Sequence, residues 1–293
     1  QEKNLLKKSK GALIIDLNKW GLENAVIEKT DGTTLYITRD IAAAIDRYKR
    51  YKFDKIFYEV GQEQKLYFRQ LFKILELMGY KWAQNCVHVD HGLYLDSRGK
   101  KFSTRKGKTV FLEDIIEKTK SLAEKEIKKR IKKISKKELE KRAMRVAIAA
   151  IFYGDLKNNR KSDVVFDINK FISFEGDTGP YLMYSYARAS SILRKSGTIL
   201  KKFELENLEE KEIELVKKLS QFSETVLNAS RSLNPSVIAN YSYQLAQAFN
   251  EFYHSCKVIG SEQETFRLAL VEAFRQVLKN SMVLLGIETV EEM

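Results

Sequence analysis

The chain has 293 residues, enough for one large domain or two smaller ones that each bury a core. Its apolar fraction of 44% is ordinary for a globular protein, and no apolar run approaches the roughly 18–20 residues of a membrane-spanning helix. The polar, basic start does not resemble a secretory signal, and the missing initiator Met indicates that the chain begins partway through something longer. Cys86 and Cys256 lack metal-ligand spacing, so we expect a reduced, cytoplasmic or organellar protein without a disulfide framework or metal site.

The net charge of +13 carries more information. Such an excess is typical of proteins with a polyanionic partner, because Lys and Arg that neutralise phosphates release condensed counterions. A Lys-rich proteome with solvated helix faces is the alternative, and the abundance of Lys and Ile fits it too. The charge alone favours nucleic acid only slightly.

The first part of the chain, from Ala25 to about Thr119, alternates predicted strands and helices. Two short strands flank Asp31-Gly32, a dipeptide that tolerates the positive φ of a hairpin turn. Thr38 is the predicted N-cap of the helix that follows, and Asp40 suits the dipole of its first turn. The predicted elements are strands at 25–29, 34–38, 53–60 and 85–95, helices at 39–51 and 62–78, a stop at Gly79, and a Gly- and Lys-rich loop at 97–108. This order predicts a parallel α/β sheet with too few strands to stand alone.

The remainder of the chain is almost wholly helical. The predicted segments are a Lys-rich stretch (112–142), an apolar and buried one (145–156), an irregular passage (158–179) and a helix that begins near Pro180. A capping-box pattern at Ser135 and Glu138 restarts a helix inside the Lys-rich stretch. Four or five further helices follow, divided at Ser196-Gly197, Asn234-Pro235 and Gly260-Ser261.

Tyr36 and Asp40 form the first cluster that could carry chemistry. Tyr36 closes a predicted strand and Asp40 opens the next helix, so both side chains could point into the crevice at the carboxyl edge of a parallel sheet. A carboxylate and a phenol that converge there would suit a cationic ligand, above all a guanidinium held bidentately. A turn, a cap and a dipole-compensating Asp are an equally good interpretation.

Two further clusters follow. The second is a basic loop, Lys100-Lys101-Phe102-Ser103-Thr104-Arg105-Lys106-Gly107-Lys108. Loops dense in cations and hydroxyls suit phosphoryl chemistry, because charge builds on phosphate oxygens in the transition state, although such loops are more often solvated than catalytic. The third cluster, Ser173 to Leu182 and on to Arg188, contains two glycines, an Asp and a Pro, and it predicts an ordered junction into a helix.

The order of these clusters resembles that of arginyl-tRNA synthetases, class I enzymes that join arginine to its tRNA using ATP. The stretch from Asp31 to Asp46 is similar to one block of that family. His88 to Gly107 is similar to a second, in which Ser-Thr-Arg-Lys replaces the usual class I KMSKS loop, and Asp167 to Arg188 is similar to a third. Even the ending, Leu284-Leu285-Gly286-Ile287 shortly before Met293, resembles the C-terminus of the family.

The resemblance implies roles for residues of the first half. Tyr36 and Asp40 match positions that recognise the arginine side chain, and Gln64 matches a glutamine that holds the substrate's α-amino group. His88 and Val89 match a segment that lines the adenine pocket. The remaining matches are in the loop that closes on the ATP phosphates, namely Ser103, Thr104, Arg105 and Lys106.

The helical part after Pro180 resembles an anticodon-binding domain. Aromatic rings that stack on unpaired bases contribute about 1–3 kcal/mol per base in RNA-binding proteins. The candidates for such contacts are Tyr241, Tyr243, Phe249, Phe252 and Tyr253, with Met293 as a further RNA-contact candidate. Most helix aromatics belong to cores, so a core position is the alternative for each of these rings.

Several departures from the family pattern matter. Phe102 stands where Met is common, His91 where Phe is typical and Met183 where Gln is typical. The HIGH motif of class I synthetases is absent, and we expect no strand before Ala25 to carry one. His88-Val89-Asp90-His91 is not that motif, because Asp replaces its small third residue and the segment lies just upstream of the signature loop.

The implied fold is the second half of a class I Rossmann-like catalytic domain (1–119), a helical connector (120–179) and an α-helical anticodon-binding domain (180–293). The implied function is ATP-dependent activation of L-arginine to arginyl-adenylate and its transfer to tRNA-Arg, with Mg²⁺ accompanying ATP. No membrane partner is implied, and we expect a monomer. The alternatives are a non-catalytic RNA-binding module derived from a synthetase and a basic helical interaction protein.

Overall fold

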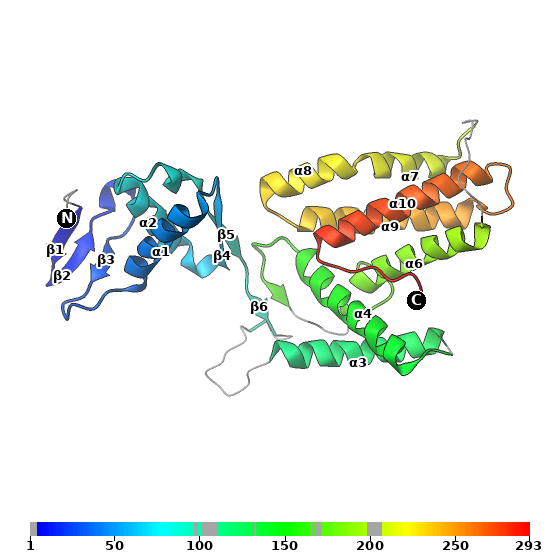
Figure 1. Cartoon of the computed structure of the whole chain (residues 1–293), viewed down its shortest axis with the longest axis horizontal. Helices are drawn as coiled ribbons and strands as arrows, with labels where there is room; N and C mark the ends of the chain where they lie inside the picture. The colour runs from blue at the N-terminus through cyan, green and yellow to red at the C-terminus, as the bar shows by residue number, and fades with distance from the viewer. Residues whose placement is uncertain are drawn as a thin grey trace. The chain divides into compact units, whose positions relative to one another are not determined.

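A computed structural model describes residues 5–96, 99–100, 111–131, 133–165, 167, 171–197 and 207–293. The chain divides into two compact units, Gln1–Leu93 and Tyr94–Met293. Figure 1 shows a mixed α/β arrangement in the first unit and a helical one in the second. None of the helices in the described part of the chain combines the length and apolar composition that a bilayer crossing requires.

The first unit begins with a three-stranded antiparallel sheet of β1 (Leu6–Ser9), β2 (Ala12–Ile15) and β3 (Ala25–Glu28), in that order. Lys10 and Gly11 both have positive φ, as in the two-residue turns that match the twist of a hairpin. The sequence patterns do not indicate these first two strands. β1 is largely polar and β2 is apolar, and the two short strands form an antiparallel hairpin without a HIGH motif.

The predicted strand at 34–38 is also wrong. Only an isolated β-bridge joins Glu28 and Thr34, and the helix α1 (Tyr36–Tyr51) begins shortly after Thr34. Its N-cap is Leu35, without a side-chain hydrogen bond, while Thr38 Oγ1 donates to the Ile27 carbonyl at 2.7 Å. The apolar helical period already starts at Ile37, which is buried together with Ala44, so packing draws Tyr36 and Thr38 into the helix.

The strand–helix–strand prediction is confirmed for the second part of this unit. β4 (Ile56–Gly61) and β5 (Cys86–His91) pair in parallel, and α2 (Lys65–Leu77) connects them after a short 3-10 turn. Leu71, Ile74 and Leu75 of α2 are fully buried. However, β3 belongs to the antiparallel sheet, so the prediction of one continuous parallel sheet is wrong.

The second unit is built from helices around one core. Its helices are α3 (Leu112–Arg130), α4 (Lys136–Leu156), α6 (Gly179–Ser196), α7 (Glu210–Ser220), α8 (Phe222–Ser232), α9 (Ser236–Ser255) and α10 (Glu264–Leu284). In Figure 1, α3 and α4 form a helical hairpin, and α9 and α10 lie side by side. The rings of Phe249 and Phe274 stack between these last two helices with centroids 3.8 Å apart. β6 (Tyr94–Leu95) pairs in parallel with β7 (Val164–Val165).

The predicted helix boundaries of this unit are largely confirmed. Ser135 is the N-cap of α4 and accepts a hydrogen bond from the Glu138 backbone at 3.3 Å. The Glu138 carboxylate, however, pairs with Arg142 at 2.6 Å in place of the reciprocal capping-box bond. Pro180 lies in the first turn of α6 after the N-cap Thr178, and Gly197 ends that helix with a positive φ.

Candidate functional site

Tyr36 and Asp40 lie four residues apart on α1 and therefore share one face of the helix. Tyr36, the first residue of the helix, is 75% exposed, whereas Asp40 is half-buried. The prediction that Tyr36 closes a strand is wrong. The two side chains nevertheless lie on one face, because a single helical turn separates them.

Asp40 is held by a second tyrosine, Tyr67, in the first turn of α2. The Tyr67 hydroxyl donates a short hydrogen bond to Asp40 Oδ2. Burial, followed by this hydrogen bond and the charge of Asp40, raises the pKa of Tyr67, so the phenol stays protonated and acts as a donor. Within the described residues Asp40 Oδ1 accepts no hydrogen bond, so the carboxylate keeps an oxygen for a cationic ligand.

The first turn of α2 also reaches β5. Gln64 is exposed and lies immediately before α2, three residues from Tyr67 and four from Phe68, so the three share one side of the helix. The Phe68 ring stacks on the imidazole of His88 with centroids 4.5 Å apart. His88 Nε2 lies 2.9 Å from the Val60 carbonyl, which can only accept, so Nε2 carries the proton.

Asp40 therefore contacts the first turn of α2 through Tyr67, and His88 contacts it through Phe68. Gln64 directly precedes this turn. Val89 follows His88 in β5 and faces the other side of the strand pair, because successive side chains of a strand alternate. Sequence reasoning missed Tyr67 and Phe68, although their positions three and four residues after Gln64 could have indicated them. The predicted loop residues Ser103, Thr104, Arg105 and Lys106 lie outside the described residues.

The second unit contains a groove of about 850 Å³ with basic and aromatic walls. Arg188 lies between two tyrosines in this groove, with its guanidinium carbon 4.9 Å from the ring centre of Tyr184 and 5.1 Å from that of Tyr253. It also donates to Asn250 Oδ1 at 2.5 Å. Lys195 and Lys257 line the same groove and are exposed. These contacts orient the guanidinium, whose N–H groups suit hydrogen bonding to the edge of a base or to a phosphate.

Met293 lies in the same groove because the segment before it is tied down by arginines from the bundle. Arg145 pairs with Glu288 at 2.8 Å, and Arg194 donates to the Glu291 carbonyl at 3.1 Å. Arg142 donates to the Glu292 carbonyl at 3.1 Å. The segment, red in Figure 1, runs from the end of α10 back along α4 and α6.

The predicted RNA-stacking aromatics separate into two groups. Tyr241 and Phe252 are buried, as is Phe249, and the Tyr241 hydroxyl donates to the Lys218 carbonyl at 3.0 Å. The core alternative therefore holds for these rings, because they offer no face to a ligand in this structure. Tyr253 is 39% exposed within the groove, and Tyr243 is half-buried against Tyr181 with ring centroids 5.6 Å apart. Sequence reasoning assigned no role to Tyr184 and Arg188, one helical turn apart.

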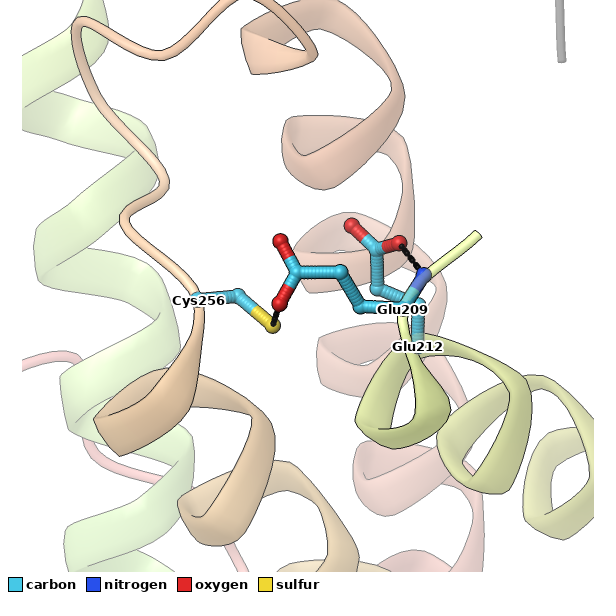
Figure 2. Close-up of side chains that lie close together, drawn as sticks. All are labelled: Glu209, Glu212 and Cys256. Atoms are coloured by element: carbon cyan, nitrogen blue, oxygen red, sulfur yellow. Dashed lines mark hydrogen bonds between the residues drawn. The ribbon is translucent and has the colours of Figure 1, made fainter. Parts of the chain in front are cut away.

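One cluster in the described part of the chain has the spacing of metal ligands, and it does not fit Mg²⁺. Figure 2 shows Glu209, Glu212 and Cys256, whose ligand atoms lie within 4.8 Å of one another. Arg267 already pairs with both carboxylates, at 2.7 Å for Glu212, and the Cys256 thiol contacts Glu209 at 3.5 Å. A guanidinium occupies the place of a cation, and sulfur is a poor ligand for Mg²⁺.

Comparisons with known proteins agree with this arrangement. Residues 1–168 match the family model described as tRNA synthetases class I (R), catalytic domain, and residues 182–293 match the DALR anticodon binding domain. The fold is that of a class I synthetase catalytic domain joined to a helical anticodon-binding domain.

The relatives narrow this class. The arginine–tRNA ligases of Halothermothrix orenii and Clostridium acetobutylicum are 44% and 43% identical to this chain, and each alignment covers the whole chain and 52% of the relative. The Thermus thermophilus arginyl-tRNA synthetase structure matches the whole chain with a TM-score of 0.88 at 26% identity, over 56% of its own length. The Plasmodium falciparum enzyme matches with a TM-score of 0.87 at 25% identity, over 50% of its length. The chain belongs to the arginyl-tRNA synthetase family and spans about half the length of the curated relatives it matches.

Proposed function

We propose that this chain supplies the second half of an enzyme that ligates L-arginine to tRNA-Arg at the expense of ATP. The observation that carries the proposal is the Asp40 carboxylate. It shares a face of α1 with Tyr36, and it accepts a hydrogen bond from Tyr67 of α2. A carboxylate fixed by a phenol, with one oxygen open, is a suitable acceptor for the planar fork of a guanidinium. Gln64, which caps the start of α2, is proposed to hold the α-amino group of the substrate.

The proposed reaction has two steps. The carboxylate of arginine attacks the α-phosphorus of ATP and pyrophosphate leaves. A ribose hydroxyl of the terminal adenosine of tRNA then attacks the carbonyl carbon of arginyl-adenylate, and AMP leaves. His88 and Val89 are proposed to line the adenine site, and the basic loop Ser103–Lys106 is proposed to neutralise charge on the phosphates. Mg²⁺ would accompany ATP and screen its phosphates, but the described residues offer no site that fits it.

The groove of the second unit is proposed to receive unpaired bases of the anticodon loop. Its support is the guanidinium of Arg188, which lies against the rings of Tyr184 and Tyr253, and the arginine-tied segment that brings Met293 to the same groove. The proposed domains are the catalytic part (1–119), a helical connector (120–179) and the anticodon-binding domain (180–293). We also propose a cytoplasmic monomer.

A tRNA titration tests the RNA half of this proposal. The chain is titrated with arginine-accepting tRNA and with an unrelated tRNA at several salt concentrations. We expect a preference for the former that survives at high salt, and we expect Arg188→Ala to reduce that preference roughly ten-fold, the scale of one hydrogen bond to a charged group. Arg231→Ala removes the same charge from an exposed position outside the groove and is the matched control. Equal affinities that fall together with salt would contradict the proposal.

An arginylation assay tests the catalytic half. The sequence contains no HIGH motif, and the chain spans about half of its relatives, so we expect the isolated chain to bind tRNA but to charge it poorly or not at all. Robust arginylation by the isolated chain would contradict this expectation. A non-catalytic tRNA-binding module is the second candidate, favoured by the same half-length match. In that case arginine would not bind and Asp40→Asn would change nothing that can be measured, whereas in the proposed enzyme this substitution would remove most of the affinity for arginine.

A further inference from the structure

The positive charge of the chain is concentrated in one short segment. Residues 118–145 contain 13 basic and four acidic residues, a net charge of +9 out of the +13 of the whole chain. A Lys-rich proteome would distribute lysines over all helix faces, and it does not explain this local excess. The segment comprises the end of α3, the turn that follows and the start of α4.

The lysines of this segment are exposed and mostly unpaired. Those that are exposed and form no ion pair with any described residue are Lys118, Lys125, Lys128, Lys133, Lys136, Lys137 and Lys141. Lys136 and Lys137 stand in the first turn of α4, where the helix dipole disfavours cations. Residues that oppose such a local structural preference commonly have a functional role.

The turn adjoins the groove of the same unit. Ile131, which ends α3, is one of the residues that line the groove, together with Arg194, Lys195 and Lys257. The exposed lysines on either side of Ile131 therefore continue the basic wall beyond the groove's edge. A polyanion with one part in the groove would meet these lysines next.

We propose that the α3–α4 turn binds phosphates of the RNA strand whose unpaired bases enter the groove. The contact is independent of sequence, and it is separate from the base contact proposed for Arg188. This inference rests on the proposed tRNA function and adds a second surface to it. RNA is favoured over an anionic membrane, because the turn's isoleucines, Ile131 and Ile134, pack against the unit's own core and leave no apolar anchor beside the lysines.

The test compares two variants that each lose four charges. In the turn variant Lys128, Lys133, Lys136 and Lys137 are changed to Gln, and in the control variant Lys29, Lys49, Lys217 and Lys279, all exposed, are changed to Gln. The affinity for arginine-accepting and unrelated tRNA is measured over a range of salt. Each phosphate contact contributes roughly 0.7–0.9 to the slope of log K against log salt. We expect the turn variant to lose roughly two or more from that slope, to bind both tRNAs more weakly by the same factor, and to keep the preference between them.

The outcomes separate the two proposals. If the turn variant matches the control variant while Arg188→Ala still lowers the preference, the phosphate contact is wrong and the anticodon groove stands. If neither the turn variant nor Arg188→Ala changes tRNA binding, the RNA function itself fails. Vesicles that contain phosphatidylserine provide the third arm. Binding of the unmodified chain to them with an affinity equal to that for tRNA, lost in the turn variant, would overturn the assignment to RNA.

Discussion

Glu212 and Arg267 form an ion pair inside the helical unit, at 0% and 7% exposure. Arg267 Nε donates to Glu212 at 2.7 Å, and its other nitrogens donate to Glu209 and to the Lys257 carbonyl. Glu212 also accepts from the Glu209 backbone at 2.7 Å, which completes a capping box at the start of α7. The pair therefore joins α7, α10 and the segment at Lys257, which lines the groove.

The first prediction concerns this pair. Glu212→Ala leaves Arg267 with part of its charge unpaired in the core, and breaking a buried ion pair costs about 3–5 kcal/mol. We expect the free energy of unfolding to fall by about that amount in urea titrations followed by circular dichroism. Glu210 is exposed and lies two residues before Glu212 in the same first turn of α7, so Glu210→Ala is the control and should cost less than about 1 kcal/mol. Equal effects of the two substitutions would contradict the pair's structural role.

At the same scale, the sequence indicates the polar residues of the candidate site better than the residues that contact them. Tyr36, Asp40, Gln64 and His88 are candidates because a family resemblance marks them. Tyr67 and Phe68 could not, because an aromatic residue on an amphipathic helix is most often a core residue. Only the fold shows that one of them bonds Asp40 and the other stacks on His88. The same rule explains why Tyr241 and Phe252 are core residues.

At the level of elements, the order of helices could be predicted where Pro, Gly or Asn marks the helix ends. Pro180, Gly197 and Asn234-Pro235 mark boundaries that the structure confirms. The start of α1 could not be predicted, because Thr34 to Thr38 is rich in strand formers, and burial of Ile37 overrides that propensity. The hairpin of β1 and β2 was missed because its strands are short and its turn, Lys10-Gly11, lacks the common Asn-Gly or Asp-Gly signal.

Two charge reversals in the α3–α4 hairpin should change the free energy of unfolding in opposite directions. Lys137 lies in the first turn of α4 and four residues before Lys141, so Lys137→Glu removes a clash with the dipole and a like-charge pair. Lys128 lies in the last turn of α3, where a cation is favourable, so Lys128→Glu should do harm. We expect the free energy of unfolding to rise for the first and fall for the second, each by roughly 0.5–1 kcal/mol. Shifts in the same direction would indicate that net charge, not the dipoles, controls the stability of this hairpin.

At the level of the whole molecule, each unit carries one buried cysteine. Cys86 lies in the core of the first unit and Cys256 in that of the second. Burial raises the pKa of the Cys86 thiol from 9.0 to about 11. Burial, followed by the charge of Glu209, raises that of Cys256 from 9.0 to about 11. One thiol can therefore report on each unit.

These thiols predict a pH dependence. The folded state holds the thiol proton more tightly than the unfolded state does, so the stabilisation is fully present below about pH 9. It is lost as the pH rises from about 9 to about 11, because the unfolded thiols ionise first. We expect the free energy of unfolding to fall more steeply over this range in the unmodified chain than in the Cys86→Ala, Cys256→Ala double variant. The same slope in both proteins would contradict it. Alkylation of the native chain at pH 8 should be slow and should become rapid in urea.

The position of Met293 has a practical consequence for handling the protein. Residues 288–293 are tied by arginines along the bundle, and Met293 itself lines the groove. A purification tag fused directly after Met293 would therefore leave the molecule from within the surface that we propose for RNA, and a polyhistidine tag would add titratable cations beside Arg194 and Lys195. Tags are better attached at the other end of the chain, and any binding constant from a C-terminally tagged protein should be repeated after the tag has been cleaved.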